Sequence, residues 1–238
     1  MGRAFEFRKA RKMKRWSNMA KTFTRIGRDI IIAVKDSGPD PSSNSRLRAI
    51  IQNAKAANMP KDNIERAIKK ASEKSTENFK EVLLEGYAPH GIAIIIEAAT
   101  DNNNRTVANI RSYFNKCDGS LATSGSVDFL FNHHCFFQIK NEGLNIEELE
   151  LELIDFGAIE LSKLENEISI TAKFEDFGSI QKELEKRNIE ISSSEFEREA
   201  INTKNLNEEE RQKVEKLLNM IDEDEDVQNV YHDMKIID

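Results

Sequence analysis

The apolar positions in the first third of the chain recur with the period of an α-helix. The positions that predict the first helix are Phe23, Ile26, Ile30 and Val34. Ser37-Gly38-Pro39 ends this helix, and a second is predicted from Ser45. A third is predicted from Pro60, because proline favours the first helical position. Three short amphipathic helices with short connections predict a small bundle, which polar residues 72–78 follow as a linker.

Beyond the linker the periodicity becomes mixed. Two strands, a helix and a further strand are predicted at residues 82–87, 92–99, 106–116 and 126–131. The two strands form a hairpin around Pro89-His90-Gly91. This series lacks a closing helix and strand, and the end of the chain offers both, at residues 207–221 and 227–236.

A second series lies between these segments and is complete in itself. Its strand, helix, strand, strand, helix and strand are predicted at residues 135–140, 145–156, 159–164, 168–174, 178–188 and 189–196. The order βαββαβ is that of the ferredoxin-like fold.

The fold class that follows is α+β with three domains, a basic helical bundle and two ferredoxin-like α/β domains, one inserted in the other. The predicted domains are residues 1–78, a discontinuous domain of residues 79–131 and 205–238, and an inserted domain of residues 132–204. The alternative is two modules in sequence order. It ranks lower because it leaves a three-stranded fragment and a stray helix.

Charge is divided very unevenly along the chain. The net charge is -7 overall. Residues 1–78 hold 19 Lys and Arg against 8 Asp and Glu, a net of +11, whereas residues 79–238 hold 16 against 34, a net of -18. This asymmetry favours a polyanion-binding region attached to an acidic body. The alternative is that the two parts neutralise each other across a domain interface.

The strongest cationic signal lies at the start of the chain. Seven of the first 15 residues are Lys or Arg, Glu6 is the single acid, and Phe5, Phe7 and Trp16 are interleaved. This composition predicts an arm that is extended or poorly ordered until it meets a partner. Cations bind phosphate and aromatic rings stack on exposed bases, so the arm favours nucleic acid. The alternative is a solvated tail without a partner.

The candidate nucleic-acid-binding residues come from the arm, from the predicted helices and from the motif at 102–106. They are Arg3, Arg8, Lys9, Arg11, Lys12, Lys14, Arg15, Lys21, Arg25, Arg28, Arg48, Lys55 and Arg105. In that motif an asparagine caps the next helix, or Arg105 faces a sugar-phosphate backbone. Ser124-Gly125-Ser126 is a turn, with phosphate binding through its backbone N–H groups as the alternative.

Neither a metal nor a cofactor is expected. His133-His134-Cys135 with Cys117 lacks the spacing of a zinc site, and the acidic run at 222–226 lacks the ordered spacing of a calcium loop. Without a nucleotide-binding or hydrolase motif, we expect no enzyme. Without an apolar run of membrane-spanning length, we expect no membrane partner. The two cysteines fit a reducing cytoplasm.

Six stretches together resemble the YebC/PmpR-like family. In order they are FTRIGRDI (23–30), GPDP (38–41), NSRLRAIIQNAKAANMPKDNIERAI (44–68), EGYAPHG (85–91), TDNNNRT (100–106) and SGSV (124–127). The family includes the mitochondrial translational activator of cytochrome c oxidase subunit I. The resemblance implies three domains, the first helical, and a role in gene expression. Members are commonly described as transcriptional regulators that bind DNA, and others act at the ribosome, easing synthesis of consecutive prolines.

The chain departs from the family pattern at three places. The usual start Gly-His-Ser-Lys-Trp is replaced by residues 2–8, GRAFEFR. Ala88-Pro89-His90-Gly91 stands where many members have Gly-Pro-Gly-Gly, and Cys117-Asp118-Gly119 where Asn-Gly-Gly is frequent. The basic character of the start survives these changes.

The function expected from the sequence is a non-catalytic, nucleic-acid-binding regulator of gene expression. DNA-bound transcription regulation stands first, and ribosome-associated translation regulation through ribosomal RNA is nearly equal. A protein-interaction module with a basic docking arm is the alternative of another class. The protein is expected to be a cytoplasmic monomer.

Overall fold

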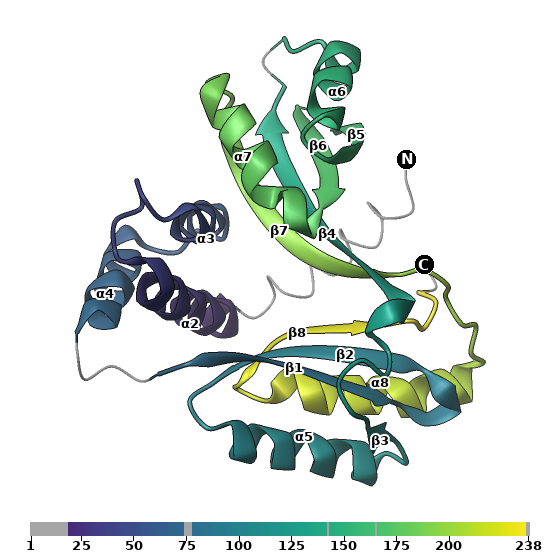
Figure 1. Ribbon diagram of the computed structural model, residues 1–238. Coiled ribbons are helices and arrows are strands. Elements are labelled where there is room, and N and C mark those ends of the chain that lie inside the picture. The colour runs from purple at the N-terminus through teal and green to yellow at the C-terminus, as the bar shows by residue number, and fades with distance from the viewer. Residues whose placement is uncertain (1–18, 74–77, 142, 165, 237–238) are drawn as a thin grey trace. The chain divides into compact units, whose positions relative to one another are not determined.

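The computed structural model describes residues 19–73, 78–141, 143–164 and 166–236 (Figure 1). The chain divides into two compact units. Unit 1 comprises residues 1–74 and 133–197, and unit 2 comprises residues 75–132 and 198–238. Unit 1 thus holds the first and the inserted predicted domain together, and the three-domain boundaries stay a prediction.

Unit 1 begins with the predicted helices, α2 (Met19–Ser37), α3 (Ser45–Ala56) and α4 (Lys61–Ser72). Helix α2 packs against both of the others. Five successive α2 residues, Ile30 to Val34, are therefore buried, a wider surface than the single apolar stripe predicts.

The corner between α2 and α3 is held by one buried side chain, Asn44. Its Oδ1 accepts a hydrogen bond from the Leu47 N–H (2.9 Å), which caps α3. Its Nδ2 donates to the carbonyls of Ala33 (2.7 Å) and Gly38 (2.9 Å). Both ends of the amide are used, so asparagine is the residue that this corner requires.

We expect Asn44→Ala to destabilise unit 1 by about 2–3 kcal/mol, because a cap is lost and two carbonyls lose their donor in a buried site. Thermal unfolding and hydrogen exchange of α3 amides measure the loss. Ser43→Ala, at the exposed neighbouring position, is the control. Equal stability of the two variants would contradict this role.

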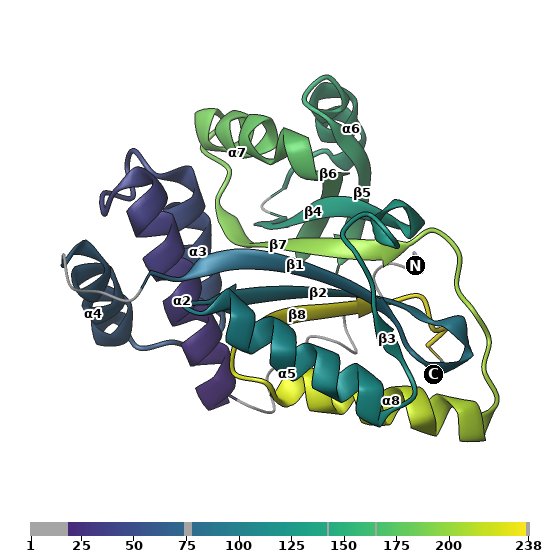
Figure 2. The same cartoon turned by 60° about the horizontal axis from the view of Figure 1, so that its bottom comes forward.

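The second half of unit 1 has the predicted βαββαβ order. Its elements are β4 (Phe131–Lys140), α6 (Ile146–Ile154), β5 (Ala158–Leu164), β6 (Glu167–Lys173), α7 (Phe177–Lys186) and β7 (Ile191–Ala200). The strands lie in the order β5-β6-β4-β7, which is ferredoxin-like. Helices α6 and α7 cover one face of the sheet (Figures 1 and 2). Phe137, Ile170 and Leu153 are fully buried between the layers.

Unit 2 is an antiparallel sheet with two helices side by side on one face (Figures 1 and 2). Its elements are β1 (Lys80–Tyr87), β2 (Ala93–Thr100), α5 (Asn103–Lys116), β3 (Ser120–Leu121), α8 (Glu208–Glu223) and β8 (Val227–His232). Ile94, Ile96, Phe114 and Leu217 fill the core between sheet and helices. The segments that close this unit are those at the end of the chain, as the element order predicted.

The strand order of unit 2 is β3-β1-β2-β8, so the predicted hairpin forms the centre of the sheet, and the element order ββαβαβ is the predicted one. One detail differs from the prediction. The predicted strand at 126–131 is wrong, because the third strand is Ser120–Leu121 and residues 128–130 form a 3-10 turn. The amides of residues 125, 127 and 128 bind the Glu85 carboxylate instead.

The β1–β2 turn contains residues 88–91, one of the three places where the chain departs from the family pattern. His90 has φ +63° and Gly91 has φ +73°, so both lie in the left-handed region that favours glycine. A histidine, not a glycine, stands at position 90 in this chain. Its Nδ1 lies 3.6 Å from Glu210 Oε1 at the start of α8.

Candidate nucleic-acid interface

The seven arm cations, Arg3, Arg8, Lys9, Arg11, Lys12, Lys14 and Arg15, lie outside the described residues. The same holds for Phe5, Phe7 and Trp16. The described cations nearest in sequence are Lys21, Arg25 and Arg28 on α2. Their spacing of four and three residues puts them on one face of that helix. They come before the buried stretch from Ile30 to Val34 and continue the positive charge of the arm into the bundle.

Arg48 on α3 is occupied by partners within unit 1. Its Nη1 donates to the carbonyls of Pro41 (2.7 Å) and Ser42 (3.0 Å). Its Nε and Nη2 donate to the two carboxylate oxygens of Glu185 on α7, at 3.0 and 3.3 Å. Arg48 therefore fixes the α2–α3 loop and neutralises a carboxylate, and its proposed phosphate contact would have to displace Glu185. Lys55, in the last turn of α3, is exposed.

Helix α4 carries cations that the candidate set missed. Arg66, Lys69 and Lys70 are exposed or half-exposed, and Ile64 and Ala71 are the buried positions of the same helix. The predicted apolar stripe of α4 already left positions 65, 66, 69 and 70 facing solvent. Reading the exposed face as well as the buried one would have found them.

Arg105, at the first turn of α5, takes part in a polar network of unit 2. Its Nη2 lies 2.8 Å from Asp101 Oδ1 and 2.9 Å from Asp226 Oδ2. The hydroxyls of Thr100 (3.1 Å) and Thr106 (2.7 Å) donate to the same Asp226 oxygen. Burial would raise the pKa of Asp226, but the bonds from Arg105 and Thr106 and the charge of Arg105 hold it below its ordinary value.

This network accounts for much of the 100–106 motif. Asn102 caps α5 by accepting from the Arg105 N–H at 3.1 Å. Thr100, Arg105 and Thr106 all converge on Asp226. Two carboxylates already balance the charge of Arg105, which favours the structural interpretation over a phosphate contact.

We expect Arg105→Gln to destabilise unit 2, because the buried Asp226 loses its cation. It should leave the salt dependence of nucleic-acid binding as in the wild type. Hydrogen exchange of α5 amides and a salt titration measure the two effects. Arg111→Gln, exposed on the same helix, is the control. If only the Arg105 variant showed a flatter slope of log K against log[salt], Arg105 would be a phosphate contact.

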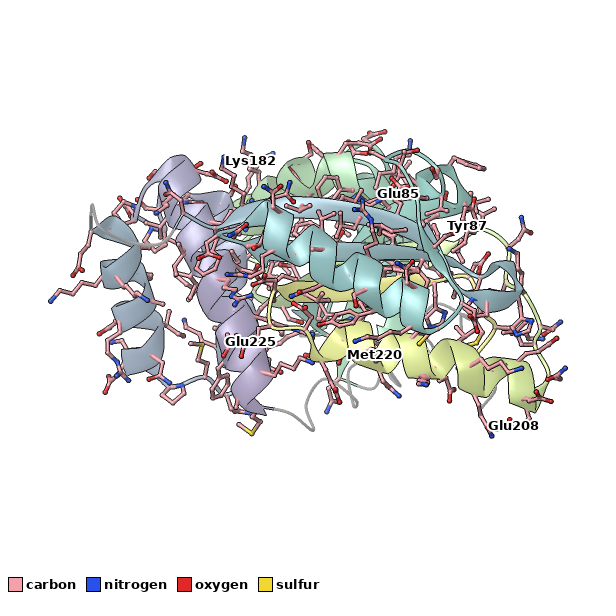
Figure 3. The ribbon with its side chains drawn as sticks, turned by 90° about the horizontal axis from the view of Figure 1, so that it is seen from below. Glu85, Tyr87, Lys182, Glu208, Met220 and Glu225 are labelled. Carbon is pink, nitrogen blue, oxygen red and sulfur yellow. The ribbon has the colours of Figure 1, made fainter. Side chains whose placement is uncertain are left out.

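The turn around Ser124-Gly125-Ser126 is occupied by an internal carboxylate. Glu85 on β1 is 2% exposed and accepts from the N–H groups of Gly125 (2.6 Å), Val127 (2.6 Å) and Asp128 (3.0 Å). Tyr87, two residues along β1, donates to the Ser126 carbonyl at 3.0 Å; Figure 3 labels both side chains. These N–H groups are therefore committed to Glu85, and the alternative of a phosphate-binding turn loses its donors.

The pKa of Glu85 reflects this arrangement. Burial would raise it, but the three backbone hydrogen bonds and the charge of Arg198 hold it below its ordinary value. The ionised form of Glu85 is thus the one that stabilises the fold. Its hydrogen bonds join the sequence motif at 85–91 to the motif at 124–127.

The residues considered for metal binding have other roles in the structure. Asp224 accepts from Asn109 and Tyr113 and from the Asp226 N–H. Cys135 lies buried, and burial raises the pKa of its thiol to about 12. His133 stacks on Phe174 with ring centroids 3.8 Å apart. Over the described ranges, no group of three or more His, Cys, Asp or Glu is arranged to hold a metal. In the same ranges, no helix is long and apolar enough to cross a membrane.

Fold and charge define a class of α+β protein in which a basic helical segment precedes two acidic, helix-covered sheets. Residues 3–74 match the model of the TACO1/YebC protein N-terminal domain, and residues 79–234 match that of the TACO1/YebC second and third domain. The chain belongs to the TACO1/YebC family. This confirms the resemblance and the α+β class.

Several relatives that carry the name "Probable transcriptional regulatory protein" match over nearly the whole chain. The protein of Flavobacterium johnsoniae is 68% identical and covers 99% of each chain. That of Porphyromonas gingivalis is 57% identical, with 99% and 98% covered. That of Myxococcus xanthus is 49% identical, with 98% and 100% covered. A crystal structure of the conserved hypothetical protein Aq1575 from Aquifex aeolicus has a TM-score of 0.74 and 39% identity, covering 93% and 92%.

Proposed function

We propose that this protein is a non-catalytic regulator of gene expression that binds the sugar-phosphate backbone through residues 1–73, and that its target is DNA. The observation that carries the proposal is the charge division, +11 in residues 1–78 against -18 in the remainder. The names of the relatives support regulation of transcription.

The described helices support the same region as the binding surface. Residues 19–73 hold eleven Lys and Arg against six Asp and Glu. The cations that we assign to the interface are Lys21, Arg25, Arg28, Lys55, Arg66, Lys69 and Lys70. Together with the arm they supply a phosphate-neutralising surface, and such contacts dominate sequence-independent affinity.

Arg48 and Arg105, the other described residues predicted to bind nucleic acid, are weaker candidates for a phosphate contact. Each is already paired with carboxylates, so binding phosphate would require breaking an existing ion pair. We assign them first to folding and only second to nucleic acid.

A second candidate function is translation regulation at the ribosome. The observation in its favour is the interleaving of Phe5, Phe7 and Trp16 with the arm cations. Aromatic rings stack on the unpaired bases that RNA loops offer and that duplex DNA does not.

Crosslinking the protein in cells and sequencing the recovered DNA and RNA separates the two candidates. Discrete DNA peaks near promoters are expected if transcription is regulated. Enrichment of ribosomal RNA with no DNA peaks would overturn the DNA target and support the second candidate. Recovery of neither nucleic acid would contradict both.

A further inference from the structure

Helix α6 presents an apolar face to solvent. Leu149 and Leu153 point into the core, whereas Leu151 is 71% exposed and Ile154 is 53% exposed. Helix α6 packs against the edge strand β5 (Figure 1). Large aliphatic side chains gathered on one exposed element mark a contact surface more often than scattered single residues do.

Acidic side chains surround this apolar face. Glu147, Glu148 and Asp155 are exposed or half-exposed, and four-residue spacing puts Leu151 between Glu147 and Asp155 along the helix. The other two acids of α6 have partners: Glu152 pairs with Arg187, and Glu150 accepts from the Leu161 N–H. A ligand for this surface must therefore combine apolar side chains with positive charge.

One segment of this chain has that composition. Residues 1–18 carry seven Lys and Arg, one acid, and the large apolar rings Phe5, Phe7 and Trp16. Eighteen residues of extended chain span about 60 Å, more than the dimensions expected of a compact unit the size of unit 1. The segment joins α2 at Met19, and both α2 and α6 belong to unit 1.

We propose that residues 1–18 dock on the face formed by Leu151 and Ile154 when nucleic acid is absent, with Glu147, Glu148 and Asp155 facing the arm cations. This rests on the proposed function, since the same cations then serve phosphate. The acidic face of α6 acts as an internal competitor, and a denser polyanion displaces it.

The competition lowers the apparent affinity for nucleic acid by the fraction of molecules in which the arm is free. Weak or isolated phosphate contacts do not release the arm, whereas an extended polyanion does. Because exposed charge pairs are screened, added salt also weakens the docked state. Docking thus makes the protein more selective for extended sites.

Trp16 reports docking directly, because it is the single tryptophan of the chain. We expect its emission in the free full-length protein to lie at shorter wavelength than in a synthetic peptide of residues 1–18. The double variant Leu151→Ser with Ile154→Ser should move it to the peptide value. Phe129→Ser with Ile201→Ser removes an apolar pair of similar exposure, 68% and 53%, from unit 2. This matched control should leave the emission unchanged.

A peptide-like emission in the wild type would overturn the proposal. So would an equal response of the control, or a signal that grows with protein concentration, which would mean docking on a second copy. Circular dichroism checks that the variants fold, and Glu147→Gln with Glu148→Gln supplies a second disruption that leaves the apolar side chains in place. This pair should also move Trp16 toward the peptide value, and no response to either pair would overturn the proposal.

A titration with duplex DNA gives the second measurement. Leu151→Ser with Ile154→Ser, which leaves the net charge unchanged, should tighten binding about three- to tenfold, and the control pair should not. If the wild type bound duplex DNA and the Leu151→Ser, Ile154→Ser variant bound it with the same affinity, the docking proposal would be overturned and the proposed function would not. Loss of all nucleic-acid binding together with a normal Trp16 response would overturn the proposed function and leave the docking standing.

Discussion

Replacing Lys9, Arg11, Lys12 and Lys14 by glutamine is expected to weaken nucleic-acid binding about 10²–10³-fold near 0.1 M salt. Each phosphate contact releases counterions, so log K falls with log[salt] by about 0.7–0.9 per contact. Losing four contacts should therefore flatten the slope by about three. Fluorescence anisotropy of labelled duplex and single-stranded oligonucleotides over a salt series measures both quantities.

The control removes the same charge from the acidic part of the chain. Lys116, Lys163, Lys182 and Lys216 lie in that part, and Lys182 is labelled in Figure 3. Their replacement by glutamine should change the slope by less than about one. If the arm variant kept the wild-type slope and affinity, or if both variants lost equally, the arm would not be the site of phosphate binding.

Removing the Glu85 carboxylate is expected to give the largest loss of stability, about 3–5 kcal/mol for Glu85→Ala. The buried Val127 N–H and the part-buried N–H groups of Gly125 and Asp128 then lose a charged acceptor in one step. Glu85→Gln keeps the shape and one oxygen, and should cost about 2–3 kcal/mol. Hydrogen exchange of β1 and β2 amides reports unit 2 separately from unit 1.

The pH dependence of this effect has a definite sign. Because folding lowers the pKa of Glu85, its contribution is fully present above the unfolded pKa of about 4.3. It is lost as pH falls through the folded pKa. The stability gap between wild type and Glu85→Gln should therefore be constant near neutral pH and shrink below about pH 4.

Glu81→Gln, an exposed position on the same strand, is the matched control and should change stability by less than about 0.5 kcal/mol. If the Glu85→Gln protein were as stable as this control, the turn at residues 124–128 would not depend on the Glu85 carboxylate for its stability. A gap that widened in acid would contradict the direction of the pKa shift.

Elements with a clear local period were predictable from the sequence. The apolar spacing of Phe23, Ile26 and Ile30 identified α2, and the alternation within residues 135–196 indicated the order of the ferredoxin-like sheet. In both cases the apolar residues recur at a regular short spacing, because one face of the helix or strand is buried.

The segment 126–131 was not predictable in the same way. Its apolar residues suggest a strand, yet its amides bind Glu85, about 40 residues earlier. The Asn44 corner likewise depends on the Ala33 and Gly38 carbonyls across the α2–α3 turn. Hydrogen bonds between residues far apart in the sequence produce no regular spacing of residue types from which they could be predicted.

For the interface, the sequence indicates the sign of the charge but not the partners of each cation. Arg48 and Arg105 belong to the basic motifs, and only the fold brings Glu185 and Asp226 beside them. Lys69 on α4, by contrast, has no ion pair within the described ranges. A cation's availability for phosphate is thus a property of the folded surface.

The central claim is that the positive first third of the chain engages a sugar-phosphate backbone. Its most direct test is a titration of the purified full-length protein with duplex DNA, single-stranded RNA and ribosomes in about 20 mM salt, repeated as salt rises. We expect the protein to bind at least one of the three, with log K falling linearly as log[salt] rises. No binding to any of them in dilute buffer would contradict it.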